Sequence, residues 1–242
     1  MPPEERLERP QITVLTHFEE LRRRLLIFIG VLFLLWLALF SQFFRLVPFL
    51  IRPYQQAFPS RELDLVFTTL PEAIMAALKS TFFLALALSL PVLVFQAWRF
   101  LSPALFEHEK RLLRKVLFVT GSLSLVGLLV AYFLVLPTLL KLLLGLGYAR
   151  FTSYLRVQSY LSFLGKGLFF AVLVAQLPGV VALLFKAGIL PERVKRKRFF
   201  YLAGGAYLVA LFLSPADIVS QIILAAVFYL LLELGFLLAK VL

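Results

Sequence analysis

The amino-acid sequence predicts an all-α integral membrane protein that crosses the bilayer six times. Of its 242 residues, 62% are hydrophobic and only 16% are charged, and the mean hydropathy is +0.95. A water-soluble domain of this composition would be coated in apolar surface, so we expect lipid to be the solvent. The apolar residues also gather into runs that are long enough to cross a hydrocarbon core of about 30 Å as helices. We expect a single membrane domain over residues 1–242.

Six apolar runs follow one another along the chain. The first four are clear spans of at least the roughly 20 residues that a spanning helix needs, and the last two are less generous. The fifth is shorter, and only Ser214–Asp217 separates it from the sixth, which predicts a tight hairpin. The first run follows Arg22–Arg24 and is long enough to span, so we expect a retained anchor and no cleaved signal peptide. The predicted spans are residues 25–44, 73–98, 116–140, 158–185, 199–213 and 218–239.

Positive charge is distributed unevenly between alternate loops. Because Lys and Arg accumulate on the cytoplasmic side of membrane proteins, we expect both termini in the cytoplasm and the protein in the inner membrane. The basic residues of the richer side are Arg6, Arg9, Arg22, Arg23, Arg24, Arg99, Lys110, Arg111, Arg114, Lys115, Lys186, Arg193, Lys195, Arg196, Lys197, Arg198 and Lys240. Those of the poorer side are Arg45, Arg52, Arg61, Lys141, Arg150 and Arg156.

Three prolines interrupt the predicted spans. Pro91, Pro137 and Pro178 fall in the second, third and fourth spans. Proline removes a backbone donor and clashes with the preceding turn, so these helices should kink or end early, and the bundle should be concave on one side. Membrane helices also tolerate proline routinely, so an undistorted bundle is an equally good interpretation.

The residue types make several functions unexpected. The chain has no cysteine, which excludes disulfides, thiolate metal sites and thiol nucleophiles. Its two histidines, His17 and His108, lie in no metal-ligand spacing, and no nucleophile elbow is present. The net charge of +12 comes from residues between apolar runs, and no basic, aromatic-rich soluble domain accompanies it. We therefore expect no enzyme, no cofactor, no metal and no nucleic-acid partner.

Two charged segments are predicted at the cytoplasmic surface. In His17–Leu25, Glu20 and Arg24 have the i,i+4 spacing that supports a helix, and the arginines suit the membrane surface. The loop Trp98–Arg111 mixes aromatic residues with acidic ones that include Glu109. Each segment alone is explained by ordinary interfacial structure. A binding role for Glu20 requires a second acidic group on the same face, and the second segment could supply it.

Polar residues inside the spans are functional candidates by default, because they are costly in lipid. Lys79 lies near the outer end of its span and Glu233 near the cytoplasmic end, so both can also be explained by snorkelling. Gln176 is deeper and stands beside Pro178, where it could bond to a freed carbonyl. The full set is Lys79, Gln96, Lys166, Gln176, Gln221 and Glu233.

Four segments together resemble the TatC family, the signal-peptide receptor of the twin-arginine protein translocase, over essentially the whole chain. His17–Leu25 carries the HxxELRxRL signature, and Phe83–Glu109 is similar to the family's second helix and first cytoplasmic loop. Ala131–Pro137 is similar to the end of the third helix. Ser214–Gln221 matches the family's SPPD hairpin and SQ pair, except that Ala216 replaces the second proline.

The resemblance implies a receptor that binds the twin-arginine signal peptides of folded exported proteins. It further implies assembly with the single-span proteins TatA and TatB in a multi-copy complex, with export driven by the proton motive force. Glu20 and Glu109 match the two cytoplasmic glutamates associated with twin-arginine recognition. An arginine presents a planar fork that suits a carboxylate, so two spaced carboxylates can distinguish an arginine pair from lysines.

The resemblance also gives roles to other positions. Arg22 and Arg24 match basic positions that orient Glu20, and Phe100 matches an aromatic position that packs against the peptide. Pro53 matches a proline of the first external loop, either structural or in contact with a ligand. Five positions remain as contacts with TatA or TatB, as intramembrane polar groups or as plain packing: Lys79, Tyr132, Gln176, Asp217 and Gln221.

The main departure from the family is Gln176, where many members have a glutamate facing the concave cavity. A mechanism that needs a charged carboxylate at mid-membrane is therefore doubtful here, although an amide can still dock a partner helix. The alternative function is a small-solute or ion secondary transporter, which would place ionisable sites near the midplane, often in two related halves. A purely structural scaffold is the third possibility.

Overall fold

The computed structural model describes residues 14–60, 65–101, 107–148, 154–186, 197–213 and 218–241, and it confirms the all-α class. Two very short strands, β1 and β2, are the other elements in this part of the chain. In order, the elements are α1 (Val14–Ser41), α2 (Phe43–Ala57), β1 (Leu65–Val66), α3 (Glu72–Leu101), α4 (Glu107–Val130), the π-helical segment η3 (Ala131–Val135), α5 (Leu136–Tyr148), β2 (Leu155–Arg156), α6 (Val157–Ala175), α7 (Leu177–Lys186), α9 (Arg198–Leu213) and α10 (Ile218–Val241).

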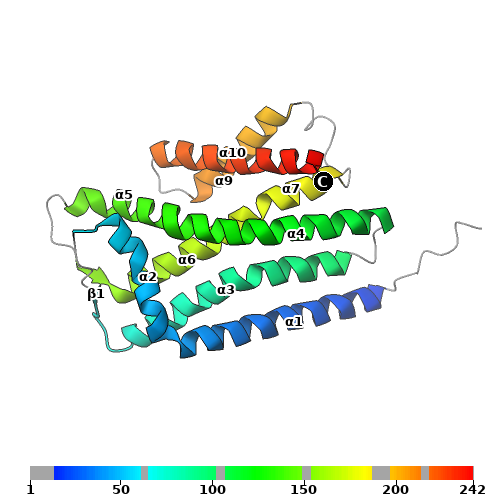
Figure 1. Cartoon of the computed structure of the whole chain (residues 1–242). Coiled ribbons are helices and arrows are strands. Elements are labelled where there is room, and N and C mark those ends of the chain that lie inside the picture. The colour runs from blue at the N-terminus through cyan, green and yellow to red at the C-terminus, as the bar shows by residue number, and fades with distance from the viewer. Residues whose placement is uncertain are drawn as a thin grey trace, which may run out of the picture.

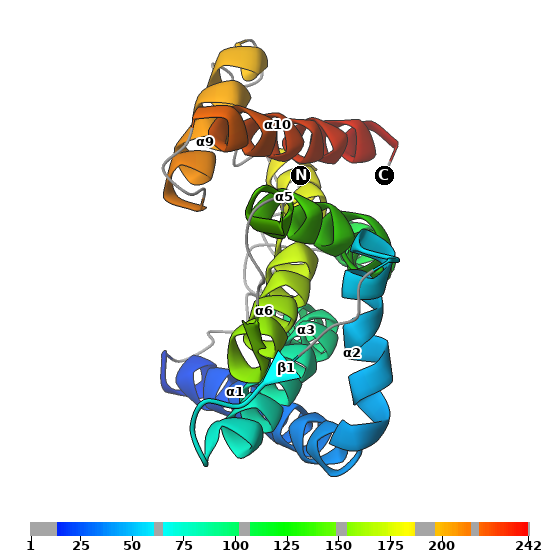
Figure 2. The ribbon, with the colours of Figure 1, turned by 90° about the vertical axis from the view of Figure 1, so that its left-hand side faces the viewer.

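The helices form a row of packed neighbours (Figure 1). α3 packs against α1 on one side and α6 on the other, α4 packs against α6 and α7, and α10 packs against α7 and α9. α1 begins, α3 ends and α4 begins at one end of the bundle, which we call the N-terminal end. The opposite end, which we call the strand end, holds α2 and the parallel pair β1–β2. Figure 2, which looks at the strand end, shows α2 crossing from the end of α1 toward α5.

Within the described residues, four helical stretches are long and apolar enough to cross a membrane: Phe18–Ser41, Glu72–Phe100, Phe118–Gly145 and Val157–Ala182. These stretches overlap the first four predicted spans. The residues predicted for the last two spans form α9 and α10.

The first helix ends before the predicted end of the first span. We expected the span to run to residue 44, but α1 ends at Ser41 and the chain turns at Gln42 before α2 begins. A straight continuation would have carried Arg45 and Arg52 along the spanning direction. The turn instead makes α2 a separate helix across the strand end, where its basic and amide side chains are exposed and Leu50 is buried.

The three prolines have three different outcomes. α3 continues past Pro91 to Leu101, so the second helix does not end early. The π-helical segment Ala131–Val135 comes just before Pro137, and such an insertion is a known cause of bending in a helix. In the fourth span, α6 stops at Ala175 and a turn at Gln176 precedes α7, so the early end predicted from Pro178 is confirmed.

Glycine allows the closest helix contacts. At Gly165 of α6, an added Cβ would lie 3.2 Å from the Ser80 carbonyl oxygen of α3. At Gly235 of α10, it would lie 2.8 Å from the Pro178 carbonyl oxygen and 2.7 Å from Cβ of Val181. Small residues of this kind let membrane helices approach closely enough for van der Waals packing, which is a main source of stability in lipid.

We predict that Gly235→Ala destabilises the protein by about 1–3 kcal/mol, because the new methyl group overpacks a contact with backbone that cannot move freely. Gly204→Ala is the control, since a Cβ there meets nothing within 4 Å. Thermal unfolding in detergent should show a lower midpoint for the first variant and an equal or higher one for the second. Equal midpoints for both variants would contradict the close α7–α10 contact.

Candidate functional site

Glu20 is tied to the neighbouring helix through Arg24. Oε1 of Glu20 lies 2.6 Å from Nη2 of Arg24, the i,i+4 pair that the sequence predicts. Nη1 of Arg24 in turn donates to Oε1 of Gln96 on α3, at 3.4 Å. Gln96 is buried, so this contact fixes the arginine against α3. The Glu20 carboxylate is consequently half-buried and held in place at the N-terminal end.

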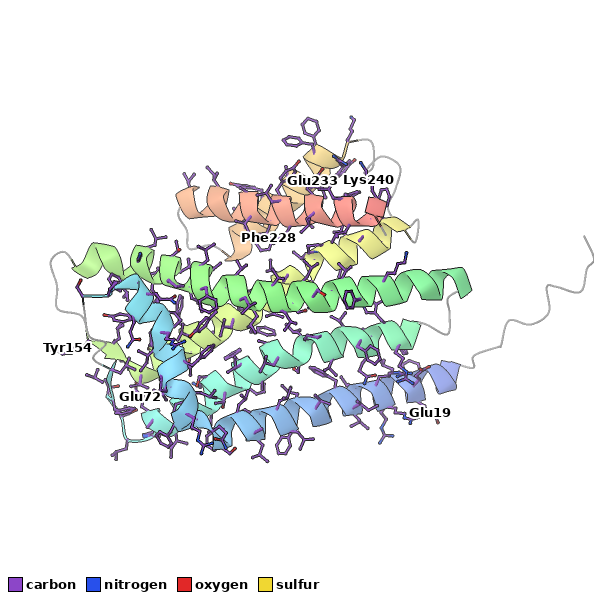
Figure 3. All side chains as sticks on the ribbon, in the orientation of Figure 1. Glu19, Glu72, Tyr154, Phe228, Glu233 and Lys240 are labelled. Carbon is purple, nitrogen blue, oxygen red and sulfur yellow. The ribbon has the colours of Figure 1, made fainter. Side chains whose placement is uncertain are left out.

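Arg22 lies on a different face of α1 from this pair. Arg22 is exposed and lines a shallow hollow of about 510 Å³ with its neighbours on the same helix. The other lining residues are Glu19, Arg23, Leu26 and Ile27. Glu19, labelled in Figure 3, marks this position near the start of the helix. Arg22 and Arg24 were both expected to orient Glu20. Of the two, Arg24 makes this contact.

Two buried donors at the N-terminal end lack an acceptor in the described part of the chain. They are Nε of Arg24 and Nε1 of Trp98. Buried polar groups in folded proteins are nearly always hydrogen-bonded, so each of these donors calls for an acceptor that the described residues do not supply.

Phe100 and Glu109 belong to the same end of the bundle. Phe100 is half-buried in the last turn of α3, and Glu109 lies in the first turn of α4. Because α1 begins, α3 ends and α4 begins there, Glu20, Phe100 and Glu109 are brought to one end (Figure 1). The side chain of Glu109 lies outside the described part of the structure.

Gln176 is buried between helices and does not bond to a carbonyl freed by the proline. Its Nε2 donates a short hydrogen bond to Oγ of Ser124 on α4, while its Oε1 has no partner among the described residues. The turn between α6 and α7 aims this side chain at α4. Gln176 therefore links the third and fourth spans in the middle of the bundle.

Tyr132 and Tyr160 attach α2 to the bundle. The Tyr132 hydroxyl donates to the Phe49 carbonyl oxygen at 2.7 Å, and the two rings stack with centroids 4.1 Å apart. The Tyr160 hydroxyl donates to the Leu50 carbonyl oxygen at 3.0 Å. Pro53 is buried inside α2. In this chain the Tyr132 ring is thus used in internal packing.

The remaining predicted residues are dispersed. Lys79 is exposed on α3 near the strand end, and Gln221 is half-buried on α10. Asp217 lies outside the described residues. Glu233, for which snorkelling was one explanation, pairs with Arg198 of α9, with Oε1 and Nη2 2.6 Å apart.

Glu72 is a buried polar residue that sequence reasoning missed. Its Oε2 accepts from the backbone nitrogen and the hydroxyl of Thr68 at 2.7 and 2.8 Å. Its Oε1 faces Nε of Arg156 at 3.4 Å and the backbone nitrogen of Gln158 at 3.5 Å. Glu72 therefore ties the segment after β1 to β2 and α6 (Figure 3). The one sign of Glu72 in the sequence was its position as an acidic residue at the start of an apolar span.

This arrangement defines a class of protein: a multi-helix membrane protein with an organised charged site at one end and buried polar contacts between its spans. The chain matches the family model described as Sec-independent protein translocase protein (TatC) over residues 16–226. This match covers most of the 242 residues, and the chain therefore belongs to the TatC family.

Relatives and solved structures agree with this assignment. The chain is 33% identical to the Sec-independent protein translocase protein TatC of Aquifex aeolicus, covering 93% of each chain. It is 34% identical to TatC of Escherichia coli strain K12, covering 92% of this chain and 86% of that protein. A crystal structure of the twin-arginine translocase receptor TatC superimposes with a TM-score of 0.76 at 32% identity, covering 93% of this chain and 98% of the other.

We predict that Tyr132→Phe lowers the stability of the purified protein by about 0.5–1.5 kcal/mol, because the Phe49 carbonyl loses its hydrogen bond. Tyr154→Phe is the matched control, since Tyr154 is 66% exposed. Thermal unfolding of the isolated chain is the measurement. An unchanged midpoint for Tyr132→Phe would instead favour a role for this hydroxyl in contacts with a partner.

Proposed function

We propose that this protein is the receptor subunit of a twin-arginine translocase and binds the signal peptides of folded cargo at its N-terminal end. The main supporting observation is the position of Glu20, which belongs to the family signature. Arg24 bonds to Glu20 and to Gln96, at the end of the bundle where the first turn of α4 contains Glu109. Family membership supports the same function, since the crystal structure with the same fold is that of a twin-arginine translocase receptor.

The chemistry of recognition follows from the two carboxylates. In the proposed complex, Glu20 and Glu109 each accept hydrogen bonds from one guanidinium of the arginine pair. Arg24 bonds to Oε1 of Glu20, and no described residue bonds to Oε2, which in this proposal receives the ligand. A guanidinium offers parallel N–H groups to a carboxylate, whereas a lysine ammonium offers a point charge. Phe100 then packs against apolar residues that flank the arginines.

Assembly completes the proposed function. In this proposal the chain forms one six-span domain, concave on one side, in the inner membrane, with both termini in the cytoplasm. It associates with TatA, TatB and further copies of itself, and the proton motive force drives export. Gln221 is half-buried on α10, whereas Gln176 is buried, so Gln221 is the amide more readily reached by a partner helix.

We predict that the purified protein binds an Arg-Arg signal peptide roughly tenfold or more tightly than its Lys-Lys counterpart, since charge-assisted hydrogen bonds contribute about 1.5–3 kcal/mol each. Glu20→Gln and Glu109→Gln should each reduce this preference toward unity. Fluorescence anisotropy with labelled peptides measures both affinities.

Glu19→Gln is the control for this measurement, because it removes the same charge from the neighbouring position on α1. We expect it to keep the Arg-Arg preference. If Glu19→Gln erased the preference as fully as Glu20→Gln, general electrostatic attraction would explain binding. If all variants bound both peptides equally, the assigned site would be wrong.

Orientation has its own test, because the chain contains no native cysteine. Thr69→Cys, at the strand end, should react in intact cells with a thiol reagent that does not cross membranes. Lys197→Cys, in the turn before α9, should react only after the membrane is opened. The reverse pattern would overturn the proposed cytoplasmic location of the N-terminal end.

A further inference from the structure

An open groove lies between α3 and α6 near the strand end, away from the charged site at the N-terminal end. Its volume is about 740 Å³. Basic and aromatic side chains dominate its walls, and both helices and β2 contribute to it. The residues that matter here are Lys79, Phe82, Phe83, Arg156, Ser162 and Lys166.

The two lysines come from the two helices that meet at this groove, Lys79 from α3 and Lys166 from α6. On each helix, the lysine and the other residues that line the groove are spaced three or four positions apart. Each helix therefore presents one face to the groove. The close approach of α3 and α6 at Gly165, next to Lys166 in the chain, sets the distance between the two faces. At a rise of 1.5 Å per residue, Lys79 lies about 10 Å from the start of α3 and Lys166 about 14 Å from the start of α6.

Both lysines lack an acidic partner. Among the described residues, no carboxylate lies within ion-pair distance of either amine. Nζ of Lys166 is 5.8 Å from the centroid of the Phe83 ring, which is a weak cation–π contact. Arg156 shares the buried Glu72 carboxylate through its Nε, and its side chain is half exposed. The groove therefore carries uncompensated positive charge.

Such charge within membrane-spanning helices has a physical consequence. A cation in the hydrocarbon region is costly, and long side chains relieve the cost by extending toward the headgroups. An anion at headgroup level would pair with both amines. Oγ of Ser162, which is buried and has no partner in the described structure, adds a further donor in the same wall.

We propose that this groove binds an anionic phospholipid of the leaflet at the strand end. Its phosphate accepts from Lys79 and Lys166, and its first acyl carbons lie against Phe82 and Phe83. The donors favour a phosphate headgroup over the single carboxylate of an acidic transmembrane helix, because they come from α3 and α6. A phosphate has several oxygens, so it can accept hydrogen bonds from donors on both α3 and α6 at once.

The test is native mass spectrometry of the purified full-length protein exposed to equal amounts of phosphatidylglycerol and phosphatidylcholine with identical acyl chains. We expect phosphatidylglycerol to be retained in excess. Lys79→Gln and Lys166→Gln should each weaken that binding about fivefold, because a basic residue near an anionic headgroup has about that effect. Lys79→Arg with Lys166→Arg should keep the excess, and equal thermal midpoints show that the variants are folded.

Lys141→Gln is the matched control, since Lys141 is an exposed lysine of α5 that does not line the groove. An equal loss with Lys141→Gln, or no loss in the double glutamine variant, would overturn the proposal. Displacement of the lipid by millimolar inorganic phosphate would show that the site takes free phosphate instead. Displacement by an apolar helical peptide with one glutamate, dependent on both lysines, would assign the groove to a partner helix.

Discussion

The contact between α3 and α6 is the one on which the positions of the other helices depend. Gly165 has no side chain, so the Ser80 backbone can approach α6 closely. α1 packs on the other side of α3, and α4 packs on α6. The pair β1–β2 and the Glu72 network join the first residues of α3 and α6. This central pair therefore determines which residues meet at each end of the bundle.

Several polar groups within the bundle are shared between helices. Gln176 bonds to Ser124, Glu233 pairs with Arg198, and the Tyr132 hydroxyl bonds to the backbone of α2. Lipid offers no hydrogen bonds, so polar side chains in spanning segments find partners within the protein or extend to the interface. These contacts join helices that apolar surface alone would hold weakly, because lipid tails are as apolar as leucine.

The two ends of the molecule differ in which charge is left for a ligand. At the N-terminal end, Glu20 bonds to Arg24 through Oε1, and no described residue bonds to its Oε2. At the strand end, Glu72 is buried and fully engaged, whereas Lys79 and Lys166 have no acidic partner in the described structure. We propose that the Glu20 carboxylate receives an arginine of a signal peptide and that the two lysines receive the phosphate of an anionic lipid.

The class, the four long spans, the family and the i,i+4 pair of Glu20 with Arg24 could all be predicted from the sequence. These features depend on apolar runs and on helical spacing, which are local. The sequence did not reveal the turn at Gln42, because apolar residues continue through it. It placed Glu20 and Glu109 together only through resemblance, since they are on different helices.

Only the tertiary structure decided the long-range partners. Arg24 and Gln96 are 72 residues apart, Tyr132 and Phe49 are 83 apart, and Glu72 and Arg156 are 84 apart. The groove between α3 and α6 is likewise formed by residues that are far apart in the sequence. Which faces of two helices meet depends on close packing across the whole bundle, and the periodicity of one helix carries no information about its neighbour.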